Sequence, residues 1–187
     1  DYLAFQRKLF IHAEACKVDP RCVGQLFTKC RRSGYTNMAV ATLLAEGTMV
    51  QDKVLGIMSK TGSDARDNVF MKKVVSMYRH FPFFFKAQRL IPFLWIINWK
   101  NTVNNAYDGE RLYYLFLDEA GKWEKPADIR EAWRINRTCL IVGRKIVGTA
   151  LVGSTVNPMS KGGQQYKDLW NDSNPEERNA NGRTRSM

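Results

Sequence analysis

The feature that most constrains the fold of this sequence is a series of short apolar runs separated by segments of helical character. The runs lie at 23–28, 54–58, 112–117 and 150–153, and a further strand is expected somewhere within 93–97. Each run is short enough to be a buried strand. Strands that alternate with helices predict an α/β fold with a mostly parallel sheet and flanking helices. Because ligands of such sheets bind at the carboxyl ends of the strands, the residues that follow each run are the candidates for chemistry.

Helices are predicted after three of these strands. The segment 38–46 predicts a helix whose inward face consists of Met38, Ala41, Leu44 and Ala45. Ser63 is the predicted N-cap of a second helix, since acidic residues follow it in the first turn and suit the helix dipole. Pro126 is the predicted first residue of a third helix, with Ile129 and Trp133 facing inward.

A basic loop that contains glycine joins the first strand to the first helix. Residues 29–36 read Lys-Cys-Arg-Arg-Ser-Gly-Tyr-Thr, and they fit the phosphate-loop pattern GxxxxGK[ST] at Gly34 and Thr36. Tyr35 stands where the pattern has lysine, and Lys29 stands where it has its first glycine. Because amides at a helix start bind anions, we expect this loop to hold phosphates, with Lys29 replacing the missing lysine and Thr36 reaching Mg²⁺. A basic surface turn before an ordinary helix is the alternative.

Two acidic residues follow the apolar run 112–117. Asp118 and Glu119 have the form of a Walker B motif. Asp118 is predicted to hold Mg²⁺, and Glu119 is predicted to orient and polarise the attacking water, because phosphoryl transfer depends mainly on positioning and on neutralising charge. The alternative is a strand that leads into a solvated acidic turn.

The charge balance favours a polyanionic partner. Lys and Arg number 29 against 18 Asp and Glu, which gives a net charge of +11 on 187 residues, a length typical of one domain. Lys72, Lys73, Arg111 and the stretch 178–185 are candidates for salt-sensitive contacts with DNA phosphates, although each is equally compatible with a solvated face. The longest apolar run, 90–97, is far shorter than the roughly 20 residues that span a membrane, so no membrane partner is expected.

The order of the motifs resembles that of one family. Gly153, Ser154 and Thr155 end the last strand, after the loop and the acids, and a Gly-Gly pair follows at 162–163. This combination resembles the ATPase domain of the large terminase subunit of tailed phages, the DNA-packaging motor. Some members have Lys at the first loop position and Tyr before the last Ser/Thr, and the family places an arginine within the loop, where Arg31 and Arg32 stand. The similarity covers roughly residues 5–187.

The resemblance implies a P-loop NTPase fold of the RecA/ASCE type over residues 1–170. The tail 171–187 is expected to be a polar linker toward a nuclease domain that lies outside this sequence, which starts at Asp1 without an initiator Met and is expected to be part of a longer chain. Cleavage of DNA is therefore not expected of these residues. The implied nucleotide site, for ATP with Mg²⁺, consists of Lys29, Gly34, Tyr35, Thr36 and Gln6, with Thr36 and Asp118 on the metal. The implied catalytic residues are Glu119, Arg31 and Arg32, and the implied coupling residues are Gly153, Ser154 and Thr155.

The resemblance also implies partners and a place of action. These are double-stranded DNA, a portal protein, a small terminase subunit and further copies of the chain in a ring, in the host cytoplasm and transiently at the procapsid portal. Two alternatives remain open from the sequence. One is another nucleic-acid-stimulated ATPase such as a helicase, and the other is a basic nucleic-acid-binding module without catalysis.

Overall fold

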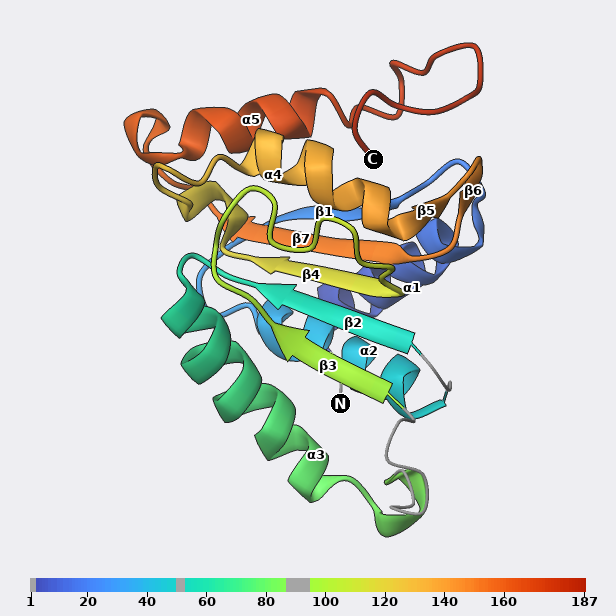
Figure 1. The fold of residues 1–187 in the computed structure, drawn as a ribbon, viewed down its shortest axis with the longest axis vertical. Coiled ribbons are helices and arrows are strands. Elements are labelled where there is room, and N and C mark those ends of the chain that lie inside the picture. Colours follow the sequence, from blue (N-terminus) through green and yellow to red (C-terminus); the bar gives the residue numbers. More distant parts are fainter. Residues whose placement is uncertain (1–2, 50–52, 87–94) are drawn as a thin grey trace.

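The computed structural model describes residues 3–49, 53–86 and 95–187. Five strands form one sheet in the order β1-β7-β4-β2-β3, and every neighbouring pair is parallel (Figure 1). The strands are β1 (Gly24–Lys29), β2 (Lys53–Met58), β3 (Trp95–Trp99), β4 (Tyr114–Asp118) and β7 (Thr149–Thr155). The predicted α/β fold with a mostly parallel sheet is therefore confirmed. Of the strand expected within 93–97, residues 93 and 94 lie outside the described residues.

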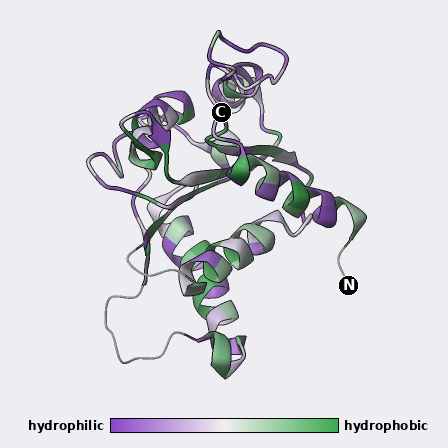
Figure 2. Ribbon diagram, turned by 90° about the vertical axis from the view of Figure 1, so that its right-hand side faces the viewer, coloured by the Kyte–Doolittle hydropathy of each residue, from purple (hydrophilic) through white to green (hydrophobic). Residues whose placement is uncertain are grey.

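Helices cover both faces of this sheet (Figures 1 and 2). One face carries α1 (Ala4–Val18), α2 (Tyr35–Met49) and the π-helical segment η1 (Asp64–Val75), which continues as α3 (Ser76–His80). The other face carries α4 (Ile129–Asn136) and α5 (Gly163–Asn171). A separate antiparallel hairpin consists of β5 (Ile141–Val142) and β6 (Lys145–Ile146). Short 3-10 turns are η2 (Phe83–Phe85), η3 (Ala120–Lys122), η4 (Arg137–Leu140) and η5 (Met159–Lys161).

Alternate residues of the central strands belong to two separate cores. Tyr114 and Phe116 of β4 pack with α2 and η1, whereas Leu115 and Leu117 pack with α4 and α5. Every residue of β4 and β7 is buried, as a parallel sheet requires when helices cover both of its faces. The two central strands are thereby held in place, and the residues that follow them emerge together at one edge of the sheet.

The inward face of α2 differs from the predicted one. Met38 and Leu44 are buried as predicted, but Ala41 is only half-buried and Ala45 is exposed. The buried residues of this helix are Tyr35, Met38, Ala39, Val40, Leu43, Leu44 and Gly47. Helix α2 packs against both the sheet and η1, so its buried face is broader than contact with the sheet alone would require. This face does not include Ala45.

Ser63 is not the N-cap that the sequence predicted. Its dihedral angles are already helical (φ −64°, ψ −41°), and its side chain makes no capping hydrogen bond. Thr61 takes this role, since its Oγ1 accepts a hydrogen bond from the Asp64 amide at 3.1 Å. The helix therefore begins earlier than Ser63, and the acidic residues that indicated it lie in its first turns.

Pro126 is likewise not the first residue of the third helix. That helix, α4, begins at Ile129, because the Asp128 carboxylate accepts hydrogen bonds from the amides of the second and third residues after it, at 2.8 and 3.3 Å. An aspartate N-cap satisfies amides that the start of a helix leaves unpaired. Ile129 and Trp133 are both buried, as predicted.

The polar residues after α5 lie against the rest of the molecule. Met187 is buried, and Trp133 Nε1 of α4 donates a hydrogen bond to the Ser186 carbonyl at 3.2 Å. This tail is mostly hydrophilic in Figure 2. The polar composition was predicted, but the position predicted for the start of the tail, residue 171, is the last residue of α5.

Tyr107, in the connection between β3 and β4, ties the loop to the sheet. Its side chain is fully buried, and its hydroxyl accepts a hydrogen bond from the Ile57 amide at 2.9 Å. The same hydroxyl donates to Asn98 Oδ1 at 2.9 Å. The ring lies over Gly56, where an added Cβ would be 2.6 Å from Tyr107 Cζ, so this strand position must be glycine.

We expect Tyr107→Phe to lower the free energy of unfolding by about 1–3 kcal/mol, because the buried Ile57 amide loses its partner. Urea denaturation followed by circular dichroism measures the loss. The matched control is Tyr113→Phe, which keeps the half-buried ring beneath Lys53 and should cost much less. Equal losses in the two variants would contradict the role given to the Tyr107 hydroxyl.

Candidate functional site

The three motifs singled out in the sequence meet at the carboxyl end of the sheet. Strand β7 lies between β1 and β4, so Lys29 pairs in register with Thr155, and Asp118 pairs with Gly153. The basic loop follows β1, and Glu119 follows β4. Parallel register therefore brings together residues that are far apart along the chain.

The backbone of the loop between β1 and α2 is left-handed at two positions. Gly34 (φ 79°) and Arg32 (φ 62°) are both in the left-handed region, which glycine enters freely and other residues rarely adopt. The loop ends where α2 begins, and the free amides of a helix start carry a partial positive charge. Arg31 and Arg32 are exposed and border the cavity above the loop.

Lys29 connects the loop to the acidic strand. Its side chain is only 7% exposed, and its ammonium lies 3.3 Å from Asp118 Oδ1 and 3.1 Å from Glu119 Oε1. It also donates to Thr36 Oγ1 at 3.2 Å, and the Thr36 hydroxyl donates to Asp118 Oδ1 at 3.1 Å. Burial raises the pKa of Asp118, and the nearby Lys29 charge acts in the opposite direction. A buried ammonium thus lies among one hydroxyl and two carboxylates.

Both carboxylate oxygens of Glu119 have partners. Oε1 faces Lys29, whereas Oε2 pairs with the Lys122 ammonium at 2.6 Å and accepts a hydrogen bond from Thr155 Oγ1 at 3.1 Å. Burial alone would raise the pKa of Glu119, but the ion pairs with Lys122 and Lys29 outweigh burial and lower it. Glu119 is therefore an ionised acceptor held in a fixed direction, on a residue with a left-handed backbone (φ 50°).

A cavity of about 450 Å³ opens beside these residues. The cations that line it are Lys29, Arg31, Arg32, Lys73 and Lys122, and Glu119 is the acidic residue among its lining. Such a lining suits a polyanion of the size of a nucleotide's phosphate groups. A larger cavity of about 830 Å³ lies between the end of α1, the start of β1 and the tail, away from the three motifs.

Sequence reasoning missed two cations of this site. Lys122 follows Glu119 by three residues on η3, and this spacing could have indicated it. Lys73 comes from η1, where its ammonium donates to Asn37 Oδ1 at 2.7 Å, next to Thr36. The sequence predicted Lys73 only as a candidate DNA contact, because nothing local shows that η1 packs beside the loop.

Tyr35 has its ring in the core rather than in the cavity that it borders. It is 2% exposed and stacks on Phe27 with ring centroids 5.1 Å apart. A Cβ at Gly153 would lie 2.1 Å from Tyr35 Cε1, so the ring fills the space above that glycine. Burial raises the pKa of Tyr35 well above its usual value. The residue in the usual lysine place is therefore a packing residue, and Lys29 carries the charge.

Gln6 touches the loop from α1. Its Nε2 donates to the Ser33 carbonyl at 3.4 Å, while its Oε1 accepts from the Leu3 amide at 3.0 Å. Gln6 thus lies beside Gly34, as a residue near a bound nucleotide would, but it is not part of the cavity lining. A base contact by this amide stays a prediction.

Each of the three residues at the end of β7 contacts one of the other motifs. Gly153 lies under Tyr35, Ser154 Oγ accepts a hydrogen bond from the Gly121 amide at 2.9 Å, and Thr155 bonds to Glu119. A shift of the loop or of Glu119 would therefore act directly on this strand end.

No protein-family model matches this chain, and no curated protein is significantly similar to it.

Among the helices of the described ranges, none is both long and apolar enough to cross a bilayer. In the same part of the chain, no three His, Cys, Asp or Glu side chains gather into a metal-binding group. The hydroxyl of Thr36 and the carboxylate of Asp118 are two neighbouring oxygen donors of the kind that Mg²⁺ prefers.

We expect Lys29→Met to lower the free energy of unfolding by about 3–5 kcal/mol at pH 8, because it leaves two carboxylates without their shared buried cation. The loss should shrink toward pH 5. Without Lys29, the pKa of Asp118 in the folded state rises further above its value in the unfolded state. A carboxyl group with a raised pKa favours the folded form at a pH below its unfolded-state pKa. This contribution is lost as the pH increases through the folded-state pKa.

Urea denaturation at both pH values measures this effect. Lys122→Met, which removes a partly exposed partner of the same Glu119, is the control and should cost about 1 kcal/mol or less. A Lys29→Met variant as stable as the unmodified chain at pH 8 would contradict the buried triad.

Proposed function

We propose that this chain is the ATP-hydrolysing motor domain of a viral terminase large subunit and that it moves double-stranded DNA into a procapsid. Its fold would be a P-loop NTPase fold of the RecA/ASCE type. One observation carries the proposal. Lys29 and Thr36 lie within hydrogen-bonding distance of Asp118, although 89 and 82 positions separate them along the chain. The sheet order β1-β7-β4-β2-β3, with the Ser/Thr-bearing strand between the loop strand and the acidic strand, is compatible with that fold.

The loop residues account for binding of the phosphates. Residues 29–37, which include the first residues of α2, line the cavity, and among them Arg31 and Arg32 add positive charge beside the helix start. Lys29 supplies the ammonium that the usual pattern places at position 35. Together these groups would neutralise the negative charge that builds up on the transferred phosphoryl group.

Thr36 and Asp118 are the residues that would hold Mg²⁺. When bound, the metal would neutralise charge on the phosphate oxygens. Their oxygens lie 3.1 Å apart and both also contact the Lys29 ammonium, so Mg²⁺ would share this negative charge with Lys29.

Glu119 is the group that orients the attacking water. Its carboxylate is ionised, borders the cavity and is directed by Lys122 and Thr155. It can accept a hydrogen bond from water and polarise it toward the terminal phosphate. Because Thr155 binds Glu119 and Ser154 binds the turn after it, the state of the site would pass to β7 and to the DNA-gripping parts.

The partners follow from the resemblance and belong to the proposal. They are duplex DNA, a portal protein, a small terminase subunit and other copies of the chain in a ring. The place of action would be the host cytoplasm, transiently at the procapsid portal.

We expect Glu119→Gln to reduce ATP hydrolysis by about 10²–10⁴-fold while the affinity for MgATP stays within a few-fold, since the amide keeps the shape but cannot act as a base. Phosphate release and binding of a fluorescent ATP analogue measure the two quantities. Glu124→Gln, an exposed acid near Lys60, is the matched control and should change neither. Unchanged hydrolysis in Glu119→Gln would reject the assignment.

A comparison of nucleic acids separates the packaging motor from the two alternatives. Hydrolysis stimulated by duplex DNA, with no strand separation, supports the motor. Strand separation driven by ATP would favour a helicase, and absence of ATP binding would favour a non-catalytic module.

A further inference from the structure

A second group of cations lies at the end of the sheet opposite the nucleotide cavity. It consists of Arg137 in η4, Arg144 and Lys145 in the β5–β6 hairpin, and Arg183 and Arg185 in the tail. The hairpin precedes the first residue of β7, whereas the cavity borders its last residue, so the full length of this strand separates the two places. Figure 1 shows the hairpin and the tail on the same side of the molecule. We call these five residues the basic ridge.

Direct contacts join the members of the basic ridge. Arg183 Nη2 donates to the Arg144 carbonyl at 3.4 Å, and Arg137 Nη1 donates to the Arg185 carbonyl at 3.3 Å. Arg144 and Lys145 are neighbours in the chain, and two positions separate Arg183 from Arg185. The ridge is therefore one continuous surface built from three segments.

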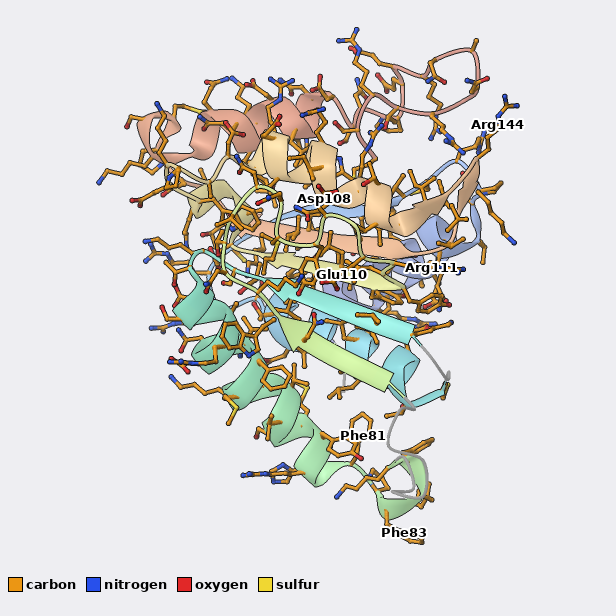
Figure 3. The ribbon with its side chains drawn as sticks, in the orientation of Figure 1. Phe81, Phe83, Asp108, Glu110, Arg111 and Arg144 are labelled. Carbon is orange, nitrogen blue, oxygen red and sulfur yellow. The ribbon has the colours of Figure 1, made fainter. Side chains whose placement is uncertain are left out.

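No member of the basic ridge forms an ion pair within the described part of the chain. Asp128, Glu131 and Asp172 line a cavity with Arg137 and Arg185, but these acids are engaged by α4. The arginine contacts above are with backbone carbonyls. The adjoining helix α4 shows the contrast, since Arg130 pairs with Asp172 at 2.9 Å and Arg134 pairs with Glu131 at 2.6 Å. Figure 3 shows Arg144 pointing outward at the tip of the hairpin, away from Asp108 and Glu110.

The composition and shape of the ridge point to a phosphodiester backbone. Four of its five cations are arginines, whose planar guanidinium groups match phosphate oxygens in pairs. The hairpin exposes Arg144 and Lys145 beside the cations of η4 and the tail, so these two side chains can contact phosphates along one face of a duplex. Side chains held by the tail at the base of the hairpin can then contact the flanking phosphates.

We propose that the basic ridge is a binding surface for duplex DNA that acts independently of nucleotide. The choice of DNA among polyanions rests on the proposed function, but the surface itself needs no contribution from the ATP site. It would bind without regard to sequence, because its groups meet phosphates rather than base edges.

Fluorescence anisotropy of a labelled duplex, titrated with the full chain without nucleotide, tests this proposal. Five phosphate contacts predict a slope of log affinity against log salt of about −4 to −5. The variant Arg144→Ala/Lys145→Ala/Arg183→Ala should bind at least about tenfold more weakly at low salt, with a slope of about −2. Arg144→Glu changes only the exposed tip and should weaken binding in the same direction.

The control is Arg7→Ala/Lys8→Ala/Arg79→Ala, which removes the same charge from exposed positions on α1 and α3. It should keep the affinity and slope of the unmodified chain. Equal losses in both triple variants, or an unchanged ridge variant, would overturn the proposal whatever the ATPase result. Ridge-dependent binding to anionic vesicles with unchanged DNA binding would overturn it in favour of a lipid surface.

Discussion

The buried ion pairs of Lys29 with Asp118, the last residue of β4, and with Glu119, the residue after it, are the interactions on which the site depends. Strand β1 contributes the ammonium, the end of β4 and the turn after it contribute the two carboxylates, and the start of α2 contributes the Thr36 hydroxyl. The ammonium is almost fully removed from solvent. Charges in such a place stabilise a structure only when every partner is present, because each is costly to bury alone. A single side chain therefore keeps the basic loop and the acids in one arrangement.

The sequence predicted much of the architecture, since patterns within single strands are local information. The apolar runs at 23–28 and 112–117 were long and regular enough to place β1 and β4 within two residues. The meeting of Lys29, Thr36 and Asp118 was also predictable, because parallel strands align their carboxyl ends. Asp118 and Glu119 were found from the same rule.

What the sequence could not predict depended on tertiary contacts. The buried face of α2 differs from the predicted one because η1 packs on this helix. Lys73 of η1 borders the cavity for the same reason. Pro126 was preferred as a helix start, but the Asp128 carboxylate forms two hydrogen bonds to the helix that proline cannot provide. The helix α5 and the β5–β6 hairpin were missed because both are short: the helix has nine residues with few apolar ones, and each strand of the hairpin has two residues.

The contact between Tyr35 and Gly153 has a consequence for the irregular loop. A glycine inside a buried strand usually weakens it by leaving a gap, but here an aromatic ring fills that gap. A lysine at position 35 would vacate the space and leave a void beside β7. Packing thus links the departure of the loop from the usual pattern to the glycine in the neighbouring strand. Lys29, at the start of the loop, carries the charge that the pattern places at position 35, and the Tyr35 ring fills the space above Gly153.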